Sequence, residues 1–228
     1  MDAGGVCGGD MVEIEGAFCT ALAQTCLRKR LAWQCKEFAT TSKCVGPVVR
    51  KHYCIDRYEW PNRAGDRPSI LHTWHDASAS CAAAGKRLCT EDEWSMACEG
   101  PAQLPFPYGY SRDAAKCAID KTSPKVDETK LRAARTRDAE VARLDQREPS
   151  GARPGCVSGY GVFDLTGNVD EWVVNETRQP YRSALKGGNW GEYRQACRPS
   201  TRAHDEGWWY YQTGFRCCRD AAPSPAAR

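Results

Sequence analysis

The chain of 228 residues lacks the features of a membrane-spanning or nucleic-acid-binding protein. No apolar run approaches the ~20 residues that a transmembrane helix needs. The start, MDAGGVCGGD, has neither the basic segment nor the apolar stretch of a secretory signal peptide. Lysine plus arginine exceed aspartate plus glutamate by only three, an excess too small to favour nucleic acid. The composition therefore predicts no transmembrane segment and no nucleic-acid partner.

Histidine is scarce, and the Cys-x-x-Cys spacing is missing. The chain has 4 histidines, and none of its 14 cysteines has the spacing typical of structural zinc or of a thioredoxin-type dithiol. So many cysteines favour disulfides made in an oxidising compartment, although cysteine also serves as a small buried hydrophobic residue. We expect a periplasmic or extracellular protein whose signal is not present in this chain.

The cysteines fall unevenly along the chain. Five lie before residue 50 and nine lie after it. Because both counts are odd, complete pairing within the chain requires at least one bridge between the two parts. We therefore expect residues 1–50 to form a cysteine-rich extension packed on a main domain at 51–220. The polar end, 221–228, has the composition of a disordered tail.

Local patterns predict short strands and a few helices. Thr90 and Glu93 have the spacing of a capping box, which indicates a helix that starts there and ends near Gly100. The segment 25–44 looks like an insertion and gives no clear prediction. The other expected elements are strands at 11–19 and 52–60, a helix from Asp76 to Gly85, and a charged surface helix near 128–147.

Three ordered motifs carry a family resemblance: GVFDLTGNVDEW at 161–172, KGGNW at 186–190 and GFRCC at 214–218. With GKRLCTEDEWSMACEG at 85–100, they resemble the formylglycine-generating enzyme (sulfatase-modifying factor) family, a variant of the C-type lectin fold. The resemblance begins near residue 10. It implies a single disulfide-rich α+β domain with short strands and two or three helices.

The first motif resembles the calcium site of this family. The matching positions bind calcium through the side chains of Asp164 and Glu171 and the carbonyls of Gly167 and Val169. Calcium is a hard cation that prefers carboxylate and carbonyl oxygens. A polar turn that bonds to itself without a metal is the alternative. The resemblance implies structural calcium.

The second motif leads into the place where the family's catalytic members carry two cysteines that bind copper(I). Counted from Gly187 and Gly188, those positions are Glu192 and Cys197. A carboxylate is a poor substitute for a copper(I) thiolate, so the resemblance implies a member without formylglycine-generating activity. The alternative is a copper- or iron-dependent oxidoreductase acting on a peptide or thiol through Cys197, with Glu192 or His204. Against it, Cys197 can be bridged and His204 can be an ordinary surface or core residue.

Aromatic and basic residues gather near the C-terminus, in the segment that lines the ligand groove in this fold. Large aromatic side chains and arginines suit a peptide, protein or glycan ligand, although core packing accounts for at least half of the aromatics. We expect a calcium-stabilised binding protein. The candidate ligand-binding residues are Trp190, Tyr193, Arg194, Arg198, Trp208, Trp209 and Tyr210.

The resemblance also implies a disulfide between Cys98 and Cys217. Cys81 to Cys89 is the second expected bridge. The other pairings do not follow from the sequence.

Overall fold

The computed structural model describes residues 6–221, so the expected tail lies outside the described residues apart from Ala221. No helix in this range is long and apolar enough to cross a membrane. The strands are β1 Met11–Cys19, β2 Leu22–Leu31, β3 Gln34–Cys44, β4 Val48–Asp56, β5 Arg87–Leu88, β6 Asp170–Val174, β7 Ser183–Lys186, β8 Ser200–Thr201, β9 Thr213–Phe215 and β10 Cys217–Asp220. The helices are α1 Trp74–Ala83, α2 Glu91–Glu99, α3 Glu128–Arg132 and α4 Ala134–Leu144.

Two four-stranded sheets, with orders β1-β4-β10-β5 and β8-β7-β6-β9, form the body. Helix α2 contacts strands of both sheets, and its Trp94 packs in the main core with Ile14, Ile55, Val173 and Ala184. The expected strand at 11–19 is β1, and its partner β4 starts and ends earlier than the expected strand at 52–60. One antiparallel and one mixed sheet, with helices packed on them, confirm the expected α+β, C-type-lectin-like fold.

The N-terminal segment is built into the first sheet. β1 pairs antiparallel with β4 along its whole length, from Met11 opposite Asp56 to Cys19 opposite Val48. The odd cysteine counts require a bridge across residue 50, and the bond between Cys7 and Cys54 is that bridge.

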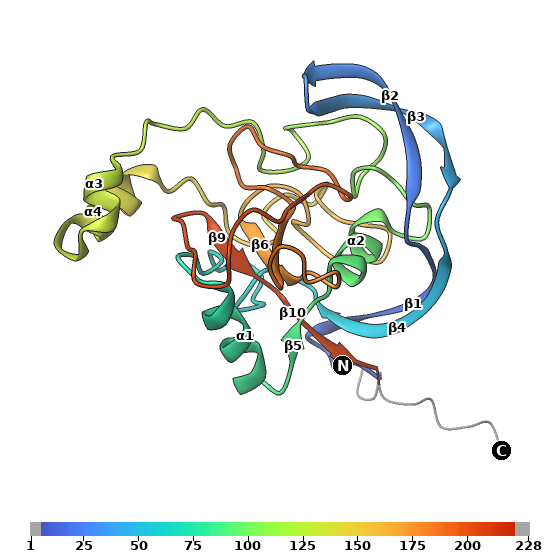
Figure 1. Cartoon of the computed structure of the whole chain (residues 1–228), viewed down its shortest axis with the longest axis horizontal. Coiled ribbons are helices and arrows are strands. Elements are labelled where there is room, and N and C mark those ends of the chain that lie inside the picture. Colours follow the sequence, from blue (N-terminus) through green and yellow to red (C-terminus); the bar gives the residue numbers. More distant parts are fainter. Residues whose placement is uncertain (1–5, 222–228) are drawn as a thin grey trace.

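The segment 25–44, whose structure was not predicted from the sequence, forms part of the β2–β3 hairpin. The hairpin continues the β1–β4 pair as one long ribbon, which arches around one side of the body (Figure 1). Disulfides close it at its base, Cys19–Cys44, and near its tip, Cys26–Cys35. These bridges hold together two strands that form a sheet of their own.

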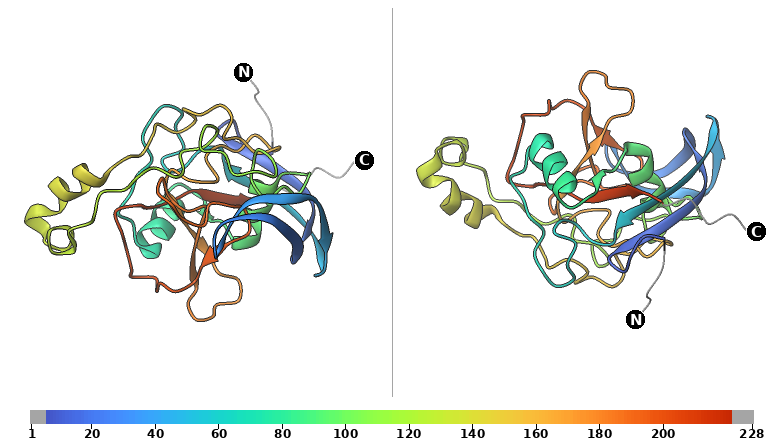
Figure 2. Two further views of the ribbon diagram at one scale, coloured as in Figure 1. Left: turned by 90° about the horizontal axis from the view of Figure 1, so that it is seen from above. Right: turned by 90° about the horizontal axis from the view of Figure 1, so that it is seen from below.

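Capping side chains determine where α1 and α2 begin. Thr90 and Glu93 form the expected capping box of α2, and Thr73 forms a second one with Asp76, so α1 starts before Asp76. The single surface helix expected near 128–147 is instead the pair α3 and α4, because Ala133 between them has extended backbone angles. This pair projects from the body at the end away from the hairpin (Figure 2).

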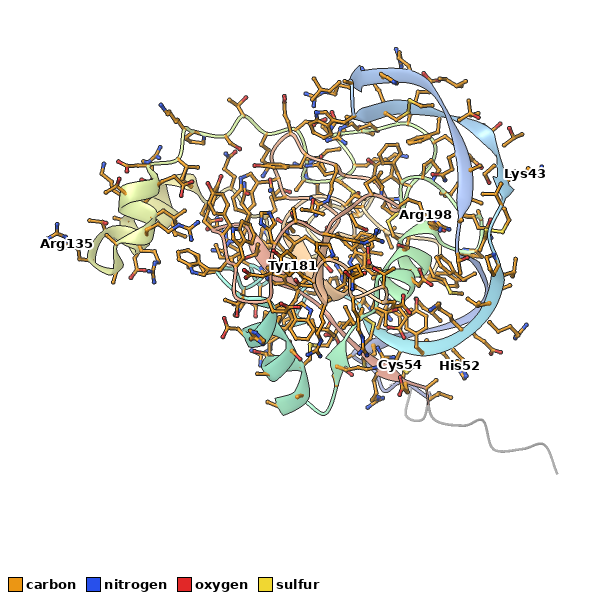
Figure 3. The ribbon with its side chains drawn as sticks, viewed as in Figure 1. Lys43, His52, Cys54, Arg135, Tyr181 and Arg198 are labelled. Atoms are coloured by element: carbon orange, nitrogen blue, oxygen red, sulfur yellow. A yellow bond between two sulfur atoms is a disulfide. The ribbon has the colours of Figure 1, made fainter. Side chains whose placement is uncertain are left out.

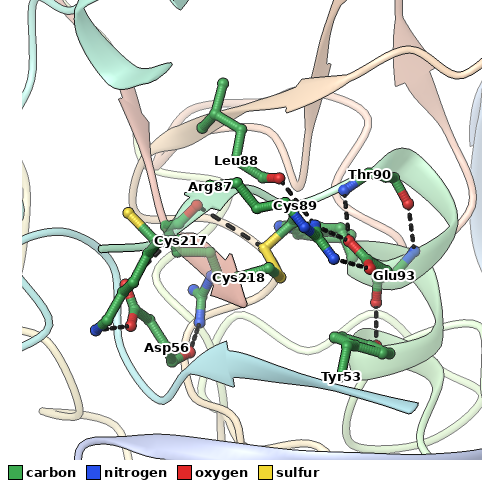
Figure 4. The surroundings of a disulfide bond; sticks show 12 residues. Tyr53, Asp56, Arg87, Leu88, Cys89, Thr90, Glu93, Cys217 and Cys218 are labelled. Carbon is green, nitrogen blue, oxygen red and sulfur yellow. Dashed lines mark hydrogen bonds and ion pairs between the residues drawn. A yellow bond between two sulfur atoms is a disulfide. The ribbon is translucent and has the colours of Figure 1, made fainter. Parts of the chain in front are cut away.

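The structure corrects both expected disulfides. Adjacent residues of a strand point to opposite faces. On β10, Cys217 therefore reaches Cys81 of α1, while Cys218 reaches Cys89, just after β5 (Figure 4). Cys98, at the end of α2, is therefore not bonded to Cys217. The remaining bonds join Cys98 to Cys197 and Cys117 to Cys156, and no cysteine is free.

Candidate functional site

The loop after β7 turns sharply at Gly187. Its φ is +83°, and a Cβ atom there would lie 2.9 Å from the carbonyl oxygen of Leu165, so the turn requires glycine. The turn directs Trp190 inward, where it is fully buried and packs against Tyr211 with 5.8 Å between ring centroids. Trp190 therefore belongs to the core and not to a ligand surface.

Glu192, Cys197 and His204 do not come together. Cys197 is fully buried and bonded to Cys98, Glu192 lies on the surface with its carboxylate 2.6 Å from Arg30, and His204 stacks on Trp208 at 3.7 Å. Within residues 6–221, no three histidine, cysteine or acidic side chains are grouped to hold a metal ion. In the described structure, the three residues named for a copper or iron oxidoreductase are therefore not grouped as metal ligands, and Cys197 is bridged.

A pocket of about 170 Å³ opens beside β6, β7 and β9. Four of the expected ligand-binding residues line it, and the sequence analysis missed most of the other residues around it. The lining residues are Tyr193, Arg194, Trp208 and Tyr210 from the expected set, and Asp170, Leu185, Asn189, Thr201, His204, Gln212 and Thr213 from elsewhere. We call this the aromatic pocket.

One wall of the aromatic pocket is charged. Asp170 accepts two hydrogen bonds from Arg194, at 2.7 and 3.0 Å, which is the bidentate geometry that arginine favours with a carboxylate. The Nε atom of Arg194 is buried and has no hydrogen-bond partner in the described structure. The pair places hydrogen-bonding groups at the wall of a small cavity.

Another part of the pocket lining is aromatic. The rings of His204, Trp208 and Tyr210 lie nearly parallel to one another. Burial lowers the pKa of His204, so this imidazole is neutral near pH 7. Aromatic faces beside a charged pair provide both contact area and orientation for a bound group.

Two expected ligand-binding residues lie elsewhere. Trp209 packs beneath the guanidinium groups of Arg132 and Arg137, from α3 and α4, at 4.7 and 4.8 Å from its ring centroid. Arg198 forms an ion pair with Glu99 and lies over the ring of Phe18, on the side facing the hairpin. Neither residue lines the aromatic pocket.

The GNVDEW motif contributes to a cluster of buried carboxylates. Glu171 accepts two bonds of 2.7 Å from the fully buried Arg216 and one of 2.8 Å from the Trp94 indole. Asp164 accepts a 2.7 Å bond from the Gly151 amide. Asp164 and Glu171 both lie near Glu59, and the negative charge of each raises the pKa of Glu59.

Glu59 is the member of this cluster that the sequence analysis missed, since it lies in the strand-like run at 52–60 with no motif around it. It accepts bonds from the Asn168 amide at 2.7 Å and the Val169 backbone at 3.2 Å. Burial, together with the charges of Asp164 and Glu171, raises the pKa of Glu59 well above its ordinary value. Burial also raises the pKa of Asp164, to about 6.

One of the three carboxylates has a cationic partner. Arg216 is the one cationic side chain among residues 6–221 that forms an ion pair with any of the three carboxylates. Unpaired buried charge is costly, and burial accordingly raises the pKa of both Glu59 and Asp164. Among residues 6–221 the three carboxylates are not by themselves a metal-binding group, so a cation held by Asp164 and Glu171 would also need the backbone carbonyls of Gly167 and Val169. An oxygen of Asp164 and one lone pair on a Glu171 oxygen remain without partners.

Comparisons with known proteins agree with the fold and the motifs. The model of the sulfatase-modifying factor enzyme 1-like domain matches residues 35–221. The mouse formylglycine-generating enzyme is 29% identical over 72% of this chain and 50% of its own length. Mouse "Inactive C-alpha-formylglycine-generating enzyme 2" is 30% identical over 77% of this chain and 59% of its own. The chain thus spans about half of each of these relatives.

A solved structure shares the fold over nearly the whole chain. PvdO from Pseudomonas aeruginosa superposes with a TM-score of 0.58 and 18% identity, covering 92% of this chain and 94% of its own. The family model, the motifs and the fold agree. The chain belongs to the sulfatase-modifying factor enzyme 1-like domain family.

Proposed function

We propose that this chain is a calcium-stabilised binding protein of the sulfatase-modifying factor family that does not make formylglycine by the two-cysteine route. The bond between Cys98 and Cys197 carries this proposal, because it removes the one thiolate that the sequence keeps at the family's copper site. Glu192, at the other position, is an exposed carboxylate paired with Arg30. Soft thiolates are what select copper(I), and the bridged protein has none to offer there.

The seven disulfides support an oxidising location, periplasmic or extracellular, since the cytosol keeps thiols reduced. The proposed ligand is a peptide, a protein or a glycan. Its recognition is assigned to the aromatic pocket, where Arg194 and Asp170 supply hydrogen bonds and Trp208 supplies contact area. The small volume of the pocket suits one side chain or one sugar ring of a larger ligand.

Calcium is the proposed structural ion. Asp164 and Glu171 would hold it with the carbonyls of Gly167 and Val169, and it would offset the buried negative charge around Glu59. At 100-fold excess over its Kd, a ligand that binds the native state alone adds about 2.7 kcal/mol of stability.

Thiol counting and elemental analysis of the unreduced protein test the proposal. We expect no free thiol, stoichiometric calcium, and no stoichiometric copper or iron. We expect EDTA to lower the free energy of unfolding by about 2–3 kcal/mol, the size of the stabilisation given above. Magnesium at equal ionic strength is the control. A free Cys197 with copper or iron present in a 1:1 ratio would refute the binding-protein proposal.

The aromatic pocket is tested by a pair of matched tyrosines. Tyr193 lines the pocket and Tyr181 lies outside it, and the two side chains are similarly exposed, at 41% and 37%. After a screen of peptide and glycan arrays, we expect Tyr193→Ala to weaken the selected ligand at least about tenfold, as loss of an interface aromatic does. Tyr181→Ala is expected to leave the affinity unchanged. Equal effects of the two substitutions would place the ligand elsewhere.

A further inference from the structure

A second recess, which adjoins the aromatic pocket at Arg194, lies between the β2–β3 hairpin and the loop that contains Cys197. It consists of two hollows of about 390 and 230 Å³. Phe38, Ala196 and Pro199 line both hollows, so together they form one groove, which we call the hairpin groove. It extends from Val45, beside the base of the hairpin, to Trp33 at the tip.

The hairpin groove follows the edge of a strand. The consecutive residues 20–24 all line its larger hollow. Because successive side chains of a strand point to opposite faces, the part of this run within β2, residues 22–24, indicates that the larger hollow reaches the edge of β2. Phe38 of β3 lines both hollows, so the groove also extends over one face of the hairpin. Among residues 6–221, β2 pairs with β3 alone, so its other edge can accept a further strand.

The hairpin exposes large apolar side chains and is held in shape by two disulfides. Leu27, Trp33 and Val45 are 61–63% exposed, which is high for large apolar side chains. The two hairpin disulfides limit its motion, so docking would cost little ordering of the chain. Exposed apolar side chains on a rigid arm indicate a surface that a partner covers.

The positive net charge of the hairpin region favours an acidic partner. Residues 20–50 contain six lysines and arginines and one glutamate, a net charge of +5, in a chain whose total is +3. Three of these cations, Lys29, Lys36 and Lys43, are exposed and form no ion pair within the described residues. An acidic partner would be attracted to this arm, and a basic one would be repelled.

We propose that the hairpin groove binds an extended acidic peptide segment, which adds as a strand along β2. Alternate side chains of the segment would be apolar and enter the groove beside Phe38. The others would be acidic and face Lys29 and Lys43. This site is separate from the aromatic pocket, and the variants below avoid Arg194, which lines both recesses.

The test selects binders from a random decapeptide display library with the full chain. We expect acidic peptides with alternating apolar residues to be enriched. The synthesised peptide should then bind about tenfold more weakly to the Lys29→Glu/Lys43→Glu variant in fluorescence anisotropy, and more weakly as salt is raised. Ala23→Phe, which fills the groove at an exposed position without changing charge, should also weaken binding.

The matched control is Lys125→Glu/Arg135→Glu, which makes the same change in net charge at exposed positions far from the hairpin. Figure 3 shows Lys43 and Arg135 at opposite ends of the molecule. The control should bind the peptide like the parent chain, and circular dichroism should show all variants folded. Enrichment of non-acidic peptides, no enrichment, or equal effects of the two double variants would overturn the proposal. Sedimentation with phosphatidylglycerol vesicles without peptide binding would overturn it in favour of a membrane surface.

Discussion

Replacing Arg216 with methionine is expected to lower the free energy of unfolding by about 3–5 kcal/mol, which is typical when one partner of a buried ion pair is lost. Arg216 and Glu171 are both fully buried, and the guanidinium also donates 2.9 Å to the Phe163 carbonyl. Without Arg216, the Glu171 carboxylate stays in the core beside Glu59 and has no cationic side chain to pair with. Urea unfolding followed by tryptophan fluorescence measures the loss.

Arg50→Met is the matched control for Arg216→Met. Arg50 also pairs with a carboxylate, Glu15 at 3.1 Å, but most of both side chains is exposed. Exposed pairs contribute about 0–1 kcal/mol, so this variant should unfold almost like the parent chain. Combining Arg216→Met with Glu171→Gln should recover part of the loss, because it removes the unpaired charge. Similar costs for Arg216→Met and Arg50→Met would contradict the central role assigned to the buried pair.

Removing the Cys98–Cys197 bridge with two alanines is expected to cost about 3–4 kcal/mol. The two cysteines are 99 residues apart, but the Cys89–Cys218 bridge already shortens the path between them. The loop that remains to be closed has roughly 30 residues, and the chain-entropy model gives a cost of that size for it. Thermal unfolding by calorimetry measures the difference.

The Cys26–Cys35 bridge, near the tip of the hairpin, is the control for this second prediction. It closes a shorter loop, with a sequence separation of 9, and its cysteines lie partly exposed. Its removal should cost less, about 2–3 kcal/mol. If removing the Cys98–Cys197 bridge cost no more than this, the bridge would not be a main link between α2 and the Cys197 loop.

The single substitution Cys98→Ala leaves Cys197 as a free thiol. We expect this variant to generate no formylglycine on a cysteine peptide, since Glu192 still replaces the other thiolate.

Local sequence predicted what depends on neighbouring residues. The capping box of Thr90 and Glu93 specified the start of α2, and the alternation at 11–19 specified β1. The odd numbers of cysteines on the two sides of residue 50 required a bridge such as Cys7–Cys54. Each of these inferences needs a spacing or a count, and no knowledge of which distant segments meet.

The candidate site could be predicted only in part. Tyr193, Arg194, Trp208 and Tyr210 were expected near a ligand and do line the aromatic pocket. Asp170 was missed, because it lies at the start of β6 and pairs with Arg194 in the loop between β7 and β8, and this long-range contact has no signature in the sequence. Trp190 and Trp209 lie in the same aromatic-rich part of the sequence. In the structure, however, Trp190 is in the core and Trp209 packs under α3 and α4. Composition identifies a cluster, but the direction of each side chain decides its role.

The sequence by itself determined the family, through short motifs whose residues act on their own turns and helix ends. It also determined that one of the two copper-site cysteines is replaced, by Glu192. The tertiary structure decided the rest. Cys217 and Cys218 bond to different partners because they face opposite sides of β10. Cys197 is paired because the end of α2 meets its loop, and Glu59 joins the acidic cluster from the bend that follows β4. These outcomes depend on contacts between segments far apart in the chain, which spacing alone does not encode.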